Sequence, residues 1–168
     1  QGGSTLTMQL VRNLYQGGRE RTIDRKIREA KLATDIEARH PGAAGKRWIL
    51  NEYINNVPYG TVGGQTAVGV GAASRVLFGK SSSELTLSQS ALLAGLPHAP
   101  SKYNPFLAPD LARERRAQVL AKMKEQGYIS ADQAAAANRE PLGVKNSRYY
   151  AQRREGYFFD YVKKELIA

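Results

Sequence analysis

Apolar residues recur every three to four positions along most of this chain, which is the spacing of an α-helix with one buried face. In the first helical segment, Leu6, Leu10 and Leu14 follow this spacing, and we expect them to form its buried stripe. The alternating pattern that would indicate half-buried strands is nearly absent. The sequence therefore predicts a mainly α protein, folded as a compact helical domain.

Clusters of glycine and proline separate the helical segments. They occur at residues 16–18, 40–42 and 58–60, and each is expected to end a helix. The helices after the first are expected at about residues 22–39, 46–56, 67–78, 84–95 and 110–126. The third helix is expected to bury Ile49, Leu50, Tyr53 and Ile54.

The charge of the chain predicts an anionic partner. Its 25 lysines and arginines exceed its 15 aspartates and glutamates, for a net charge of +10. Composition leaves three classes of partner open, namely nucleic acid, an acidic membrane surface and a phosphate-bearing substrate. The absence of cysteine excludes disulfides, thiolate metal sites and a cysteine nucleophile. The two histidines, His40 and His98, lack ligand-like spacing, so we expect no zinc site.

The second helical segment has two unlike faces. Its more apolar face is formed by Ile23, Ile27, Ala30 and Thr34. The opposite face carries Arg21, Arg25 and Arg28 with Glu29 beside them, and Lys26 and Lys31 add flanking charge. The simplest interpretation is a solvated basic face, with an Arg25–Glu29 pair that contributes about 0.3–0.5 kcal/mol. The alternative is a polyphosphate cradle around one acid, whose pKa the neighbouring cations would depress.

The first helical segment repeats this pattern of an arginine on a polar face. Thr5, Gln9 and Arg12 face away from the leucines, with Asn13 beside them. The segment begins after Gly-Gly, where Ser4 or Thr5 can cap the helix, and free N–H groups at a helix N-terminus favour an anion. Two consecutive helices with such faces therefore predict one shared anion site.

Four segments resemble the motifs of a known family in order and spacing. They read GGSTLTMQLVRN, RKIREAKLATDIE, KRWILNEYINNVPYG and RRAQVLAKM. They are similar to the motifs of the peptidoglycan glycosyltransferase family (glycosyltransferase family 51), the transglycosylase domain of class A penicillin-binding proteins and of monofunctional transglycosylases. The similarity covers residues 1–143, and we expect residues 144–168 to be a linker or the start of a following domain, a transpeptidase.

The resemblance implies a lysozyme-like helical fold and an enzyme that polymerises lipid II into β-1,4 glycan strands, releasing undecaprenyl diphosphate. It implies that Glu29 is the catalytic acid that supports the diphosphate. The substrate-binding residues that it implies are Ser4, Thr5, Gln9, Arg12, Asn13, Arg21, Arg25, Lys26 and Arg28. The resemblance implies no metal ligands among the residues. Whether a divalent cation such as Mg²⁺ or Mn²⁺ binds at the diphosphate stays open.

The resemblance also implies partners and a location. The partners are lipid II, the growing glycan strand, the membrane surface and other cell-wall synthesis proteins, with no nucleic acid. The location is the outer face of the bacterial cytoplasmic membrane, with an anchor in an upstream segment that is not in this chain.

The chain departs from the family pattern at three points. Met8 stands where the family has the first of two glutamines, and Asn51 stands where it has glutamate, with Glu52 next to it. The family's first motif, which carries the acid regarded as the general base, is not among these 168 residues. We therefore expect these residues alone to be inactive. Two other functions stay open, a non-catalytic basic module that binds anionic lipid or nucleic acid and a glycan-cleaving relative of lysozyme.

Overall fold

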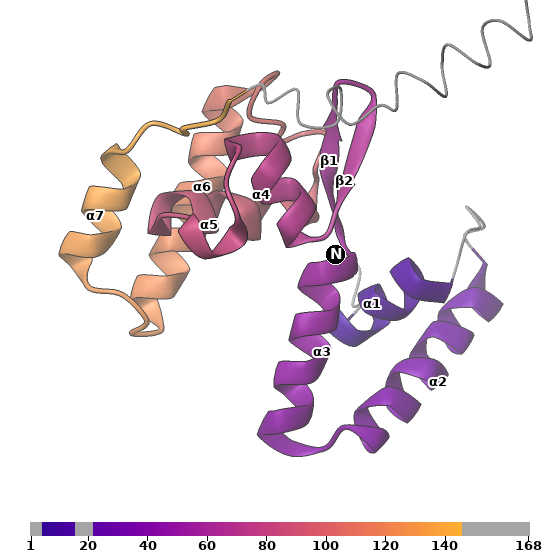
Figure 1. Ribbon diagram of the computed structural model, residues 1–168. Helices are drawn as coiled ribbons and strands as arrows, with labels where there is room; N and C mark the ends of the chain where they lie inside the picture. The colour runs from indigo at the N-terminus through magenta and orange to yellow at the C-terminus, as the bar shows by residue number, and fades with distance from the viewer. Residues whose placement is uncertain (1–4, 16–21, 146–168) are drawn as a thin grey trace, which may run out of the picture.

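The structure is a computed structural model that describes residues 5–15 and 22–145. Its first group of helices consists of α1 (Leu6–Tyr15), α2 (Ile23–Arg39) and α3 (Gly42–Asn56), with α1 packed against both α2 and α3 (Figure 1). The second group contains α4 (Val70–Phe78), α5 (Leu87–Gly95), α6 (Pro109–Glu125) and α7 (Ala131–Arg139), with short 3₁₀ turns at Ser82–Glu84 and Leu96–His98. The predicted mainly α class is confirmed.

A small antiparallel hairpin connects the two groups, with strands β1 (Pro58–Val62) and β2 (Gln65–Val68). This hairpin is not among the elements expected from the sequence, which predicts a helix from residue 67, whereas α4 begins at Val70. Gly63 and Gly64 form the two-residue turn with positive φ values of 58° and 81°. Such a Gly-Gly turn matches the twist of a tight hairpin. The Gly-Gly pair is therefore the feature of the sequence that indicates this hairpin.

The second group holds a continuous apolar core. Phe78 of α4 and Leu92 of α5 are almost fully buried there, together with Leu96. The buried guanidinium of Arg116 on α6 donates to the hydroxyl of Ser88 at 2.7 Å and to the carbonyl of Asn138 at 2.8 Å. One polar side chain therefore ties α6 to α5 and to the end of α7.

The buried stripe expected for the first helix is wrong in two of its three positions. Leu10 is buried, but Leu6 and Leu14 are 38% and 42% exposed. Thr7 and Val11 are buried in their place. The reason is that α1 packs against α2 on one side and α3 on another, so its buried arc is set by two neighbours and not by the leucine spacing alone.

The second helix turns its charged face inward. Glu29 and Ala33 are its buried residues, whereas Ile23 and Ile27 of the apolar face are 77% and 62% exposed. The two faces lie where the sequence placed them, but the face that packs on α1 is the one that carries Arg25 and Glu29.

The end of the described chain packs on the second group. Leu142 is buried, and the N–H of Lys145 donates to the carbonyl of Leu77 at 2.7 Å. The boundary between residues 143 and 144 stays a prediction. Among the helices of residues 5–15 and 22–145, none combines the length and apolar character that crossing a bilayer requires.

Candidate active site

The site is centred on Glu29, whose side chain is completely buried between α1 and α2. The helix start places it, because the Thr22 hydroxyl caps α2 by accepting the N–H of Arg25 at 3.3 Å, and Glu29 then lies one turn further along. Arg12 of α1 grips the carboxylate with two hydrogen bonds, Nε to Oε1 at 3.1 Å and Nη2 to Oε2 at 2.8 Å. Arg25 donates to the same Oε1 from its own helix. One carboxylate therefore joins two guanidinium groups from two helices.

The electrostatics of this triad hold Glu29 ionised. The hydrogen bond from Arg12 is the largest cause that lowers the pKa of Glu29 below its ordinary value, and the charges of Arg12 and Arg25 act in the same direction. Burial acts against them. The same hydrogen bond raises the pKa of Arg12. The expected depression of the acid's pKa by neighbouring cations is confirmed in direction.

The triad retains capacity for an anion from outside. Two guanidinium groups against one carboxylate leave an excess of one positive charge. The Arg12 side chain is still 39% exposed. The Nε–H of Arg25 is buried and has no hydrogen-bond partner in the part of the chain that the structure describes. A buried donor without an acceptor is unfavourable, so a shift of Arg25 that brings this atom to an oxygen would lower the free energy.

Two other predicted residues are fixed along α1. The Thr5 hydroxyl accepts the N–H of Met8 at 3.2 Å, as a capping residue does. The side-chain oxygen of Gln9 accepts the Tyr53 hydroxyl of α3 at 3.3 Å. The sequence predicts Tyr53 on the buried side of the third helix but gives no indication of its contact with Gln9.

The remaining predicted residues lie apart from the triad or outside the described residues. Asn13, Lys26 and Arg28 are exposed, and none of them forms an ion pair or hydrogen bond with Glu29 within residues 5–15 and 22–145. Ser4 and Arg21 lie outside the described residues. The structure thus brings together Arg12, Arg25 and Glu29 out of the larger set.

The donor set does not match a metal centre made by the protein alone. The described residues contain no group of three or more histidine, aspartate or glutamate side chains that could hold a metal ion. Both oxygens of Glu29 are already bound to guanidinium groups, whose positive charge opposes a cation at the same carboxylate.

Comparison with known proteins identifies the family. The protein-family model described as Transglycosylase matches residues 1–124. The chain belongs to the transglycosylase family.

The relatives of this transglycosylase chain are longer proteins. It is 47% identical over 167 residues to penicillin-binding protein 1A of Aquifex aeolicus, covering 99% of this chain and 22% of that protein. It is 42% identical over 151 residues to penicillin-binding protein 1A of Escherichia coli, covering 90% and 16%. The crystal structure of penicillin-binding protein 1A from Haemophilus influenzae matches with a TM-score of 0.56 and 35% identity, over 79% of this chain and 19% of that one. The chain thus spans about a fifth of the length of these proteins.

Proposed function

We propose that this chain is the diphosphate-binding part of a peptidoglycan glycosyltransferase. The parent protein would polymerise lipid II into β-1,4 glycan strands and release undecaprenyl diphosphate. The observation that carries the proposal is the completely buried Glu29 between the guanidinium groups of Arg12 and Arg25. This pair of arginines on two helices belongs to a chain that is itself a transglycosylase family member.

The triad suits the leaving-group half of the reaction. The growing lipid-linked glycan is the donor, a sugar hydroxyl of lipid II attacks its anomeric carbon with inversion, and negative charge develops on the departing diphosphate. Donors that are already in place stabilise such charge best, because they need not reorganise as the bond breaks. Glu29 holds the two guanidinium groups in place, and the exposed part of Arg12 meets the phosphate oxygens, with the charge of Arg25 close behind it.

The proton of the attacking hydroxyl needs a base, and the triad of Arg12, Arg25 and Glu29 does not supply one. Glu29 is matched by two cations and its pKa is lowered, so it is a poor proton acceptor. In the family pattern the acid regarded as the general base belongs to the first motif, and that motif is not among the 168 residues. We propose that the chain alone binds lipid II but forms no glycan. A polymerisation assay with lipid II checks this, and glycan product from the 168 residues would contradict it.

We propose that the two arginines, and not a metal ion held by the protein, stabilise the charge of the departing diphosphate. A divalent cation such as Mg²⁺ or Mn²⁺ would have to be held mainly by the diphosphate itself, because the triad offers it one carboxylate whose oxygens are taken. Lipid II binding by the chain is therefore expected to persist in the presence of a chelator.

The apolar face of α2 supports a membrane-bound substrate. Ile23 and Ile27 are exposed there, and Lys26 and Lys31 flank them. Apolar side chains flanked by lysines are typical of helices that lie at an anionic bilayer surface. We propose that this face meets the outer surface of the cytoplasmic membrane, where lipid II is anchored. We also propose that the parent protein contacts other cell-wall synthesis proteins, and we assign no residue to these contacts.

Binding of lipid II in detergent micelles tests the proposed function. The wild-type chain should bind lipid II, and a phosphoglycolipid inhibitor of transglycosylases should compete. Arg12→Ala should weaken binding about tenfold or more, since it removes a charge-assisted contact to phosphate. Arg113→Ala, which removes an exposed arginine of α6, is the matched control and should bind as wild type.

The competing function is a basic module that binds nucleic acid. Its support is the net charge of +10. Duplex DNA binding would fall steeply with salt and would depend little on which arginine is removed. Equal losses for Arg12→Ala and Arg113→Ala, with no competition by the phosphoglycolipid, would replace the glycosyltransferase proposal by this one.

A further inference from the structure

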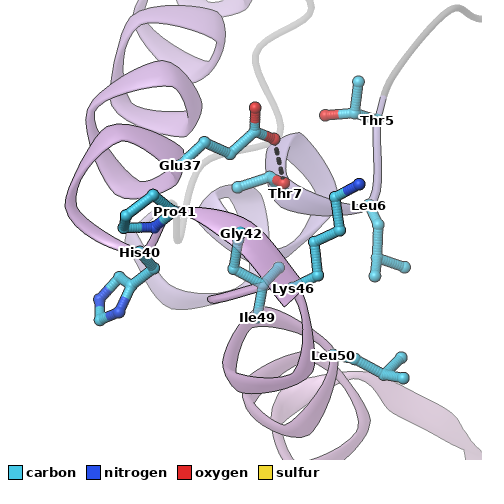
Figure 2. Close-up of a pocket in the computed structure, with 10 residues that line it drawn as sticks. All are labelled: Thr5, Leu6, Thr7, Glu37, His40, Pro41, Gly42, Lys46, Ile49 and Leu50. Carbon is cyan, nitrogen blue, oxygen red and sulfur yellow. Dashed lines mark hydrogen bonds between the residues drawn. The ribbon is translucent and has the colours of Figure 1, made fainter. Parts of the chain in front are cut away.

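A cavity of about 480 Å³ lies behind the first turn of α1, between the end of α2 and the start of α3 (Figure 2). Its walls include Leu6 of α1, Pro41 before α3, and Ile49 and Lys46 of α3. Close packing normally fixes the position of a helix, and a hollow provides no partner atoms on its side. Most of the residues that line the cavity are exposed, Leu6 of α1 among them, so on this side the first turn of α1 borders solvent and not packed side chains.

A directional contact crosses the edge of this cavity. The hydroxyl of Thr7, which is 4% exposed, donates to Oε1 of Glu37 at 2.5 Å, and Figure 2 shows the two side chains pointing toward each other. A hydroxyl bonded to an ionised carboxylate is among the stronger hydrogen bonds in proteins. Glu37 comes from the last turns of α2, so the contact joins the beginning of α1 to the end of α2.

Glu37 and Glu29 are eight residues, about two turns, apart on the same helix, and the side chains of both reach α1. Glu29 holds Arg12 near the end of α1, and Glu37 holds Thr7 near its beginning. Each carboxylate of α2 thus fixes one end of α1. The buried Leu10 between them adds apolar contact, which is strong but does not specify direction.

We propose that Glu37 is a positioning residue of the diphosphate site, a role that rests on the proposed function. Thr7 lies on the side of α1 opposite to Thr5, Gln9 and Arg12. A helix is nearly rigid, so fixing Thr7 against α2 fixes the rotation of α1 about its own axis. That rotation decides where Thr5, Gln9 and Arg12 point, although Glu37 itself need not touch the substrate.

The test compares four single variants of the 168-residue chain, together with the double variant that combines Glu37→Ala and Thr7→Val. Glu37→Ala removes the acceptor, and Thr7→Val removes the donor at nearly the same shape. Glu37→Gln keeps an oxygen that can accept the hydroxyl and should restore wild-type behaviour in large part. Asp35→Ala removes an exposed carboxylate of the same helix and is the matched control.

Two measurements separate positioning from general stability. The first is hydrogen exchange at the amides of the first turn of α1, including that of Gln9, which bonds the Thr5 carbonyl at 3.1 Å. The second is the affinity for lipid II. Glu37→Ala and Thr7→Val should each speed exchange in this turn about tenfold and weaken lipid II binding about tenfold, while exchange in α5 and α6 stays unchanged. The double variant should be no worse than either single one.

The possible outcomes decide between the two proposals. Unchanged exchange in Glu37→Ala, or faster exchange with wild-type affinity for lipid II, overturns the positioning role and leaves the proposed function intact. A failure of Glu37→Gln to restore binding, or the same loss in Asp35→Ala, also overturns it. A wild-type chain that binds no lipid II overturns the proposed function and the positioning role together.

Discussion

A buried carboxylate destabilises a fold by several kcal/mol unless its charge is matched, and Glu29 is matched from two helices. Arg12 supplies two of its hydrogen bonds and Arg25 supplies another. Removing Glu29 leaves two guanidinium groups without their shared acceptor, and removing either arginine takes hydrogen bonds away from a buried carboxylate. The triad is therefore part of the fold and of the proposed chemistry at once, and variants must be measured for both.

The pH dependence of stability follows from the lowered pKa of Glu29. Its ordinary value is 4.5, and the folded value lies below this. The contribution of Glu29 to stability is therefore fully present above pH 4.5 and is lost as the pH falls through the folded pKa. Glu29→Gln should lower the free energy of unfolding by about 1–3 kcal/mol at pH 7 and by less at pH 3.

Urea unfolding of the wild type and Glu29→Gln at pH 7 and pH 3 measures this difference. Glu114→Gln, at an exposed glutamate of α6, serves as the control and should change stability little at either pH. A difference between wild type and Glu29→Gln that is the same at both pH values would contradict the assignment.

At the scale of elements, sequence patterns predicted where α2 begins and ends but not which face it buries. Thr22 is a good capping residue, and the cluster at 40–42 stops the helix, so both ends follow from local chemistry. The buried face depends on Arg12, which lies on another helix and reaches Glu29 across the interface. A pattern within one segment contains no information about that partner. The apolar residues of α2 therefore do not predict which of its faces is buried.

The exposed apolar face of α2 predicts binding to anionic vesicles. Ile27→Ser should weaken the partition of the chain onto vesicles with phosphatidylglycerol about tenfold, because burying an isoleucine contributes about 1.5–3 kcal/mol. Its stability in solution should change by no more than about 0.5 kcal/mol, since Ile27 is 62% exposed.

Vesicle sedimentation and thermal unfolding measure the two effects of Ile27→Ser. Leu107→Ser is the matched control, because Leu107 is 81% exposed but lies in the second group of helices. Equal vesicle binding by wild type and Ile27→Ser would show that this face is not the one that meets the membrane.

In the whole molecule, the two groups of helices meet where α3 passes into the hairpin and the hairpin passes into α4. The N–H of Gly69 donates to the carbonyl of Val57 at 3.0 Å, which brings the start of α4 back to the end of α3. The family motif that covers the end of α3 stops at Gly60, and the glycine-rich stretch after it gave no prediction of this contact. The sequence could not show that one of these glycines has backbone atoms of a distant segment against it.

Gly69 is a position where a single added methyl group should strain the junction between the two groups of helices. Its φ is +83°, which a residue with a Cβ rarely adopts, and an added Cβ would lie 2.4 Å from the carbonyl oxygen of Asn55. Backbone on both sides of the contact leaves no flexible side chain to move aside. Gly69→Ala should lower the free energy of unfolding by about 2 kcal/mol or more.

Gly71, two residues further along, provides the matched control. It lies inside α4 without a positive φ, and an added Cβ would meet nothing within 4 Å. Gly71→Ala should therefore raise stability by about 0.5–1 kcal/mol, because alanine favours a helix and glycine does not. Urea unfolding compares the two variants, and similar values for both would show that the junction between the groups tolerates a side chain at Gly69. Since the triad that we propose to bind the diphosphate lies wholly within the first group, Gly69→Ala should reduce lipid II binding only in proportion to the unfolded fraction.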